Sequence, residues 1–509
     1  MTLKPIVFFA VALAVTVECP AAEPADAAGA PAPAPPPGPA AAAATFAPLK
    51  IGTVTVYGSL RSRVEGFDWF DPNSGDPNYA YSGNLLRLGF SQKRETWDWN
   101  VELGIPFLLG LPSNATGTGP QQGALGLGSN YFTANSKTQN AAMIFPKQVY
   151  ARFTQFGKSK ASTLKIGRFE FLDGSETTPK DATLATVKAN RVNQRLLGNF
   201  GWADVQRSFD GVQYSYAKPA GTFTFLGAVP TRGVFQVDGW GWNRTAFGYT
   251  SFSRPWGSGR HSAETRVLAL YYDDFRRVLK TDNRSAAVRA GDFANIKIWT
   301  AGGNSLHSFT TGAGTIDALA WGVLQGGKWG VQDHSAYAVD IEAGYQPKIL
   351  PKLKPWLRGG YEITSGDSNP NDNKHETFFQ ILPTPRPYAR FPFFNMMNNV
   401  DRFAGLTLRP HAKVTIGSEF HALALNSTND LWYTGGGVFQ PWTFGYTGRS
   451  TFGKKSLANL YDTSVEYRMN PRFTFTAYWG YAQGKAAMAA IYPTGKDGSF
   501  GYLETLFRF

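Results

Sequence analysis

The sequence contains a single cysteine, Cys19, among its 509 residues. It lies at the end of an N-terminal segment with the composition of a secretory signal, so we expect the mature chain to contain no cysteine and no disulfide bond. A lipoprotein would need a small residue directly before its lipidated cysteine, and Glu18 occupies that position. Stability must therefore come from a source other than cross-links.

Long apolar runs and clustered histidines are also absent. The apolar run 5–17 is too short to cross a bilayer as a helix, and no later stretch approaches that role. The six histidines show neither the HExxH pattern nor a paired ligand spacing, so we expect no metal centre and no cofactor. The segment Asp367–Asn373 has alternating oxygen ligands but lacks the sixth-position Gly and the twelfth-position acid of a calcium loop, which favours a plain turn.

The composition divides the chain into three parts. Residues 1–22 are interpreted as a signal peptide, residues 23–48 as an Ala/Pro-rich, disordered periplasmic leader, and residues 49–509 as the folded domain. The formal net charge is +13. Such a charge commonly indicates nucleic-acid binding, but a secretory signal argues against nucleic acid and favours an anionic solute or polymer as the partner.

The last ten residues, Phe500–Phe509, alternate strictly between two faces. One face carries Leu503, Thr505, Phe507 and Phe509, and the other carries Tyr502, Glu504, Leu506 and Arg508. A soluble sheet would bury the apolar face under helices, which this sequence does not supply. An outer-membrane barrel places that face in lipid and the polar face toward a lumen. A terminal Phe is also typical of the strand that such proteins present to the barrel-assembly machinery.

About eighteen segments show this alternation, an even number as expected for a bacterial barrel. They cover residues 53–66, 84–92, 97–105, 148–156, 162–170, 207–217, 221–229, 244–253, 261–273, 293–308, 315–324, 333–346, 354–365, 400–409, 413–425, 456–468, 472–484 and 500–509. Short connections alternate with long ones, such as 107–147, 171–206, 366–399 and 426–455. The pattern predicts an all-β fold: a transmembrane antiparallel barrel of the bacterial outer membrane, with short periplasmic turns and long extracellular loops. A soluble propeller would show a repeat of about 40–50 residues, and none is present.

Several stretches resemble the outer-membrane alginate export family. They are KIGRF (Lys165–Phe169), RSFDGV (Arg207–Val212), DIEAGY (Asp340–Tyr345), GYEITSGD (Gly360–Asp367) and the loop Asn369–Thr384. The resemblance implies an eighteen-stranded barrel with an electropositive pore. It also implies outward passage of an acidic exopolysaccharide such as alginate.

Charges on the predicted lumen face of the strands nearly balance, so the positive excess lies in loops and turns. Lumen-facing bases would include Arg61, Arg152, Lys297 and Arg358, and cross-strand pairing with carboxylates is the plain interpretation of each. Two loops are candidates for an anion filter. Residues 189–195 contain Arg191 and Arg195, and residues 383–394 contain Arg386 and Arg390 among prolines and aromatic residues. Arg168 and Arg207, from the family-like motifs, complete the predicted pore set with Arg152 and Arg358.

The sequence thus predicts an outer-membrane channel for an anionic polysaccharide, with an anion-selective or general small-solute porin as the alternative. A plugged structural barrel and an enzyme remain as further alternatives. A Ser–His nucleophile is disfavoured, because Ser418 and His421 fall on opposite faces of one strand. Expected partners are small anions or anionic polysaccharide, outer-membrane lipid and lipopolysaccharide, the barrel-assembly machinery and periplasmic export components.

Overall fold

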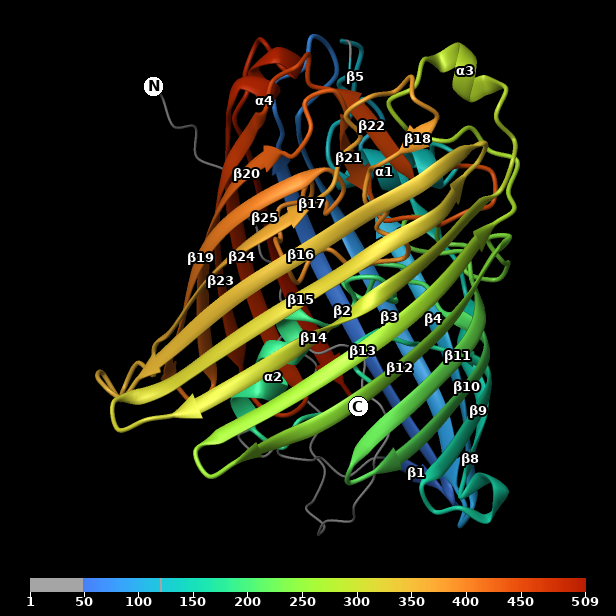
Figure 1. Cartoon of the computed structure of the whole chain (residues 1–509), viewed down its shortest axis with the longest axis vertical. Coiled ribbons are helices and arrows are strands. Elements are labelled where there is room, and N and C mark those ends of the chain that lie inside the picture. The colour runs from blue at the N-terminus through green and yellow to red at the C-terminus, as the bar shows by residue number, and fades with distance from the viewer. Residues whose placement is uncertain (1–48, 120) are drawn as a thin grey trace.

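Antiparallel strands, each paired with the next along the chain, form a closed barrel in the computed structural model (Figure 1). The structure describes residues 49–119 and 121–509, so the predicted signal peptide (1–22) and leader (23–48) lie outside the described residues. The barrel closes where the first long strand pairs with the last, from Ser59 opposite Arg508 to Asp68 opposite Ser499. Closure pairs the backbone groups that an open sheet edge would expose to lipid.

The eighteen barrel strands confirm the predicted number. They are β2 (Val54–Asp68), β3 (Asn78–Lys93), β4 (Trp97–Leu109), β8 (Phe145–Thr154), β9 (Ser162–Phe169), β10 (Phe209–Lys218), β11 (Gly221–Pro230), β12 (Thr245–Ser258), β13 (His261–Asp274), β14 (Ile296–Thr310), β15 (Gly314–Trp329), β16 (Gln332–Pro347), β17 (Trp356–Thr364), β19 (Asn399–His411), β20 (Val414–Leu425), β23 (Ser456–Arg468), β24 (Phe473–Gly484) and β25 (Gly498–Arg508).

Shorter elements occur between and beside these strands. They are β1 (Leu49–Ile51), β5 (Thr116–Gly117), β6 (Gly123–Ala124), β7 (Ala141–Ala142), β18 (Lys374–His375), β21 (Leu431–Gly435), β22 (Tyr446–Ser450), the helices α1 (Leu127–Ala134), α2 (Ala182–Arg191), α3 (Ala286–Ala290) and α4 (Ala486–Ile491), and a 3₁₀ turn at Phe156–Lys158. Within the described ranges, no helix combines the length and apolarity needed to cross a membrane. The hairpin turns gather at the lower end of the barrel in Figure 1, and β5, α3, α4, β21 and β22 lie at the upper end.

The two faces of the strands differ as the alternation predicts. On β4, Asp98, Asn100 and Glu102 are buried against the lumen, whereas Trp97 is exposed on the outer face. Outward apolar side chains elsewhere are equally open, and Ile341 on β16 is 60 % exposed. The structure corrects the predicted position of Lys297. Its neighbours Ile296 and Ile298 are buried, so Lys297 lies on the outer face of the barrel and not in the lumen.

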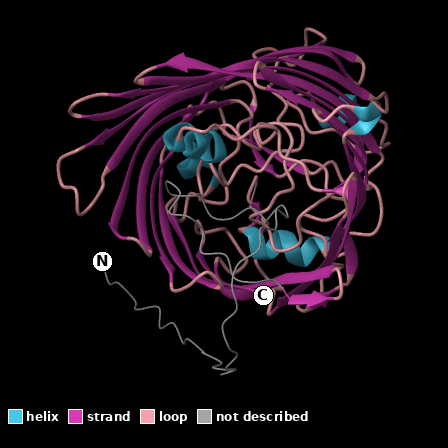
Figure 2. Cartoon of the chain, turned by 90° about the horizontal axis from the view of Figure 1, so that it is seen from below, coloured by secondary structure: helices cyan, strands magenta, loops and turns pink. Residues whose placement is uncertain are grey.

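Two long connections fill the lumen, and together we call them the inner plug: residues 171–206, which include α2, and residues 376–398. Figure 2 shows helices and loops inside the ring of strands. The two segments are joined through their backbones. The N–H of Gly198 donates to the carbonyl of Leu382 at 2.7 Å, and the N–H of Thr384 donates to that of Gln194 at 3.0 Å. Apolar plug residues such as Ile381 and Leu382 are fully buried, so the core of the protein lies within the barrel.

The outward face provides a direct test of the membrane orientation. Replacing Ile341 with Arg should destabilise the inserted barrel by about 2–4 kcal/mol, because a cation near mid-membrane loses its hydration. Thr415→Arg is the control, since Thr415 borders a lumen cavity. Folding yield is the fraction of the protein whose migration on a gel changes when the sample is boiled. It should fall for Ile341→Arg only. Equal losses would contradict the assigned facing.

Candidate functional site

Helix α2 carries the first predicted filter residues into the lumen. The Asp181 carboxylate caps its N-terminus by accepting a hydrogen bond from the N–H of Leu184 at 2.9 Å. Lys188 and Arg191 lie in the last turn, where cations interact favourably with the helix dipole. Arg195 follows one turn later and donates to the carbonyl of Arg191 at 2.9 Å. The local sequence thus sets two arginines side by side.

Both arginines are bound to carboxylates of the barrel wall. Arg191 donates to Glu342 on β16 at 2.8 Å. Arg195 is fully buried, donates to Glu362 on β17 at 2.8 Å and also pairs with Asp340 on β16. Burial opposes the charged form of Arg195, but the nearby carboxylates outweigh it and raise its pKa above the ordinary value. These side chains therefore anchor the plug to the wall, a role that differs from the free anion filter predicted for them.

The two wall arginines of the predicted pore set, Arg358 and Arg152, are likewise paired with carboxylates. Arg358 on β17 pairs with Asp317 and donates to Glu342 at 2.7 Å. Arg152 on β8 pairs with Asp98 on β4 at 2.8 Å. Both arginines thus show the cross-strand pairing with carboxylates that the sequence predicts for lumen-facing bases.

Arg207 joins separate segments through their carbonyl groups. Its guanidinium is fully buried and donates to the carbonyls of Gly436 at 2.6 Å, Val438 at 3.1 Å and Pro383 at 3.4 Å. Burial lowers the pKa of Arg207 to about 10, which still leaves it charged at neutral pH. The predicted pore residue thus ties the plug to the loop that carries β21 and β22.

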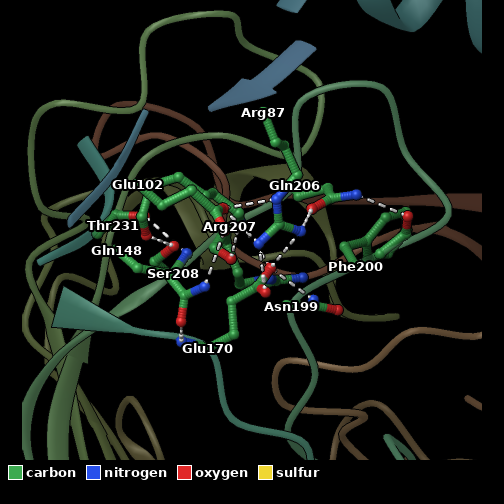
Figure 3. Close-up of polar contacts among 12 residues, drawn as sticks. Arg87, Glu102, Gln148, Glu170, Asn199, Phe200, Gln206, Arg207, Ser208 and Thr231 are labelled. Carbon is green, nitrogen blue, oxygen red and sulfur yellow. Dashed lines mark hydrogen bonds and ion pairs between the residues drawn. The ribbon is translucent and has the colours of Figure 1, made fainter. Parts of the chain in front are cut away.

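A second anchor lies around Arg87, close to Arg207 (Figure 3). Arg87 on β3 donates to Glu102 on β4 at 2.6 Å and to Glu170 at 2.8 Å. Glu170 also accepts a hydrogen bond from the side chain of Asn199 in the plug at 2.8 Å. The alternation of β3 and β4 accounts for the inward facing of Arg87 and Glu102, but it does not indicate their contact with the plug.

A cavity of about 290 Å³ lies between the inner plug and the wall. Its charged lining consists of seven arginines and four carboxylates: Arg61, Arg63, Arg191, Arg358, Arg386, Arg390, Arg409, Glu419, Asp462, Glu466 and Glu504. The cavity brings together four of the eight predicted pore residues, namely Arg191, Arg358, Arg386 and Arg390. Arg195, Arg152, Arg168 and Arg207 do not border it.

Three cavity arginines lack a carboxylate partner. Among the described residues, no carboxylate oxygen lies within 4.0 Å of the guanidinium nitrogens of Arg386, Arg390 or Arg409. Arg386 donates to carbonyls of its own loop, including that of Pro392 at 2.9 Å, and its burial lowers its pKa to about 10. The Arg390 guanidinium lies 5.9 Å from the Tyr478 ring centroid. These three cations are the ones free of neutralising ion pairs.

Arg409 was not among the predicted pore residues, although one sequence feature could have indicated it. It falls on the same face of β19 as Asp401 and Phe403, which are buried toward the lumen. The alternation of that strand therefore places it inward. Its position at the strand end, next to Pro410, obscured this.

Arg168 lies on the outer face, which corrects its predicted place in the pore. Its neighbour across the ladder is Val149, whose side chain is 43 % exposed toward the membrane. Arg168 pairs with Asp210 at 2.7 Å and donates to the carbonyl of Trp240 at 3.3 Å. A two-residue side-chain period fixes this facing, and the motif KIGRF alone does not reveal it.

The segment Asp367–Asn373 forms successive turns, as expected. The Asp367 carboxylate accepts a hydrogen bond from the N–H of Asn369 at 2.9 Å, and the Asn369 side chain accepts one from the N–H of Asn371 at 3.2 Å. One side-chain oxygen of Asp367 and that of Asn369 thus stabilise the turns by accepting the N–H two residues later.

The profile of a protein family described as alginate export matches residues 131–478, more than half of the chain. The chain belongs to the alginate export family. The match extends from α1 to β24 and includes both segments of the inner plug. No curated protein sequence matches the chain.

Solved outer-membrane proteins share the fold. OccK9 (OpdG) of Pseudomonas aeruginosa superposes with a TM-score of 0.56 at 11 % identity, covering 90 % of this chain and 98 % of its own. OpdK of Pseudomonas aeruginosa, solved with vanillate, superposes with a TM-score of 0.53 at 11 % identity, covering 89 % of this chain and 98 % of its own. OccAB2 of Acinetobacter baumannii has a TM-score of 0.53 at 9 % identity, with the same coverage of both chains. Family and fold together identify an outer-membrane channel.

The anchoring role of Glu342 predicts a local loss of order. Glu342→Ala removes the carboxylate shared by Arg191, Arg195 and Arg358, and breaking a buried pair costs about 3–5 kcal/mol. Limited proteolysis of the purified protein should then cut within residues 171–206 while the barrel remains heat-modifiable. Asp333→Ala on the same strand is the control, because its pair with Lys328 is exposed and contributes about 0–1 kcal/mol. If residues 171–206 stayed protected from proteolysis in Glu342→Ala, the anchoring role of Glu342 would be contradicted.

Proposed function

We propose that this outer-membrane channel passes an anionic exopolysaccharide, an alginate-like polyuronate, out of the cell without changing it chemically. The observation that carries the proposal is the cavity lining, in which arginines exceed carboxylates by three and three arginines have no carboxylate partner in the described part of the chain. A polyuronate presents one carboxylate per sugar, so spaced guanidinium groups complement it.

The placement of the unpaired arginines suits passage better than tight binding. Arg390 and Arg386 lie on the inner plug, and Arg409 projects from the facing wall. Contacts from both sides to one chain would be individually weak, which permits release and onward movement. Aromatic side chains in the same lining, such as Trp202 and Tyr502, offer flat surfaces for sugar rings.

The remaining partners follow from the location. We propose outer-membrane lipid and lipopolysaccharide around the outer face, the barrel-assembly machinery for insertion, and periplasmic export components that deliver the polymer. Membership of the alginate export family supports the direction of transport.

An anion-selective porin for small solutes is the second candidate. The observation that favours it is the modest size of the cavity, about 290 Å³, which is near the lower limit of ordinary small-molecule sites. In this case the same arginines would select small carboxylates, and a polymer would pass only after the plug rearranged.

The unpaired arginines predict anion selectivity in planar bilayers. A salt gradient should give a reversal potential of anion-selective sign, and polyuronate should reduce the current. The double variant Arg390→Gln/Arg409→Gln should raise the concentration for half-block by roughly 2- to 30-fold, since each solvent-accessible ion pair contributes about 0.2–1 kcal/mol. Raised salt should act in the same direction, because the Debye length is only about 10 Å at 0.1 M.

Arg402→Gln is the matched control, because Arg402 lies on the same strand as Arg409 but on the exposed outer face. It should leave both the reversal potential and the block unchanged. Block by small uronates but not by the polymer would favour the porin. Cation selectivity of the unmodified channel would refute both candidates.

A further inference from the structure

Three potential metal ligands meet in the barrel wall beside the cavity. Glu419 and His421 lie two residues apart on β20 and therefore share its inward face. Asp462 on β23 is directly opposite Glu419 in the strand pairing. One ligand atom from each of the three residues lies within 4.8 Å of the other two. The pairing of β20 with β23 therefore brings one imidazole and two carboxylates close together.

The imidazole is oriented by a fourth residue. Nδ1 of His421 donates to the Asp401 carboxylate on β19 at 2.8 Å, since an ionised carboxylate can only accept. The other ring nitrogen, Nε2, is fully buried and has no hydrogen-bond partner among the described residues. It faces the Glu419 carboxylate at 3.9 Å. A carboxylate behind a histidine with the opposite nitrogen left free is the arrangement that positions metal-ligating imidazoles.

We propose that His421, Glu419 and Asp462 bind a divalent transition-metal ion of the Zn²⁺ class, with Asp401 as a positioning residue. Zn²⁺ takes imidazole nitrogen and carboxylate oxygen at about 2.0–2.2 Å, so small side-chain rotations would close the ligand set around the ion. The ion supplies the missing partner of the buried Nε2. It also offsets the negative charges of Asp401, Glu419 and Asp462.

The surroundings leave room for both the ion and a further ligand. The Tyr478 hydroxyl donates to one oxygen of Asp462 at 2.7 Å, and the N–H of Arg390 donates to the other at 3.2 Å, so each oxygen keeps a lone pair. The Glu419 side chain is 35 % exposed, and Glu419 and Asp462 border the cavity. Three protein ligands with an open position are characteristic of zinc sites that exchange a ligand.

Arg390 is one cation beside the site, since its backbone N–H contacts Asp462, and its guanidinium has no carboxylate partner among the described residues. Arg191 also borders the cavity, but Glu342 neutralises it. A bound dication would thus extend the group of cations facing the cavity. That consequence rests on the proposed function, whereas metal binding itself does not.

Metal titration of the full-length, detergent-purified barrel tests the site. After treatment with EDTA, Co²⁺ should give visible absorption bands of a low-symmetry site, and Zn²⁺ should displace it at one equivalent. His421→Gln should weaken Co²⁺ binding at least 100-fold. Asp401→Asn should weaken it about 10- to 100-fold without changing the band positions, because the ligand set is kept.

His411→Gln is the control, since His411 lies on β19 at the exposed turn before β20. Glu419→Gln is a second variant of a proposed ligand, and it keeps the shape of the side chain. Heat-modifiable migration on a gel shows whether each variant has folded. Binding that is equal in the wild type and His421→Gln overturns the proposal. So does its absence in the wild type, which would indicate instead a protonated His421 held between Asp401 and Glu419.

The bilayer measurements keep the two proposals separate. One-equivalent Co²⁺ binding by a barrel that does not select anions would retain the metal site and remove the transport proposal. Anion selectivity without metal binding would do the reverse.

Discussion

The pairing of polar groups away from water determines the architecture of this protein. Lipid offers no hydrogen bonds to a strand backbone, so the sheet must close, and β2 must meet β25. The same constraint acts inside the barrel, because the inner plug excludes water from much of the wall. Charged side chains inside the barrel then need a partner, either an opposite charge, as at Arg195, or backbone carbonyl groups, as at Arg386.

The inner plug satisfies that requirement through its arginines. Asp340, Glu342 and Glu362 project from two adjacent strands, and alone they would repel one another in a poorly hydrated interior. Arg191 and Arg195, one helical turn apart, lie against them. Desolvation offsets much of the attraction in such pairs, so their larger effect is to specify one position of the plug. Around the cavity, Arg386 and Arg390 of the plug and Arg409 of the wall have no carboxylate partner among the described residues.

The sequence predicted the barrel well because a strand's two-residue period is a local property. The eighteen segments and the inward facing of Asp98 and Glu102 follow from alternation alone. Long-range contacts do not follow from it. Arg191 and Arg386 appear equivalent in the sequence, as loop arginines beside polar or aromatic residues. Only the docking of the plug shows that Glu342 neutralises Arg191 and that Arg386 has no carboxylate partner within residues 49–119 and 121–509.

The facing errors have a similar origin. Lys297 was assigned to the lumen from its place in the predicted strand 293–308, and Arg168 was added to the pore set from the motif KIGRF. Arg168 lies on the outer face, where Asp210 on the next strand and backbone carbonyls satisfy it. Charge alone therefore does not determine facing, and the register with a neighbouring strand does.

The motifs that carry the family resemblance take part mainly in anchoring. DIEAGY supplies Asp340 and Glu342, GYEITSGD supplies Glu362, and RSFDGV supplies Arg207, each of which holds the plug or a loop in place. The cavity cations that have no carboxylate partner among the described residues, Arg386, Arg390 and Arg409, lie outside these motifs. Residues that hold the plug can thus be shared by channels for different anions, while those bordering the cavity can change with the transported molecule. Family membership then identifies the architecture of the channel, and under the proposed function the choice of transported anion depends on the few side chains around the cavity.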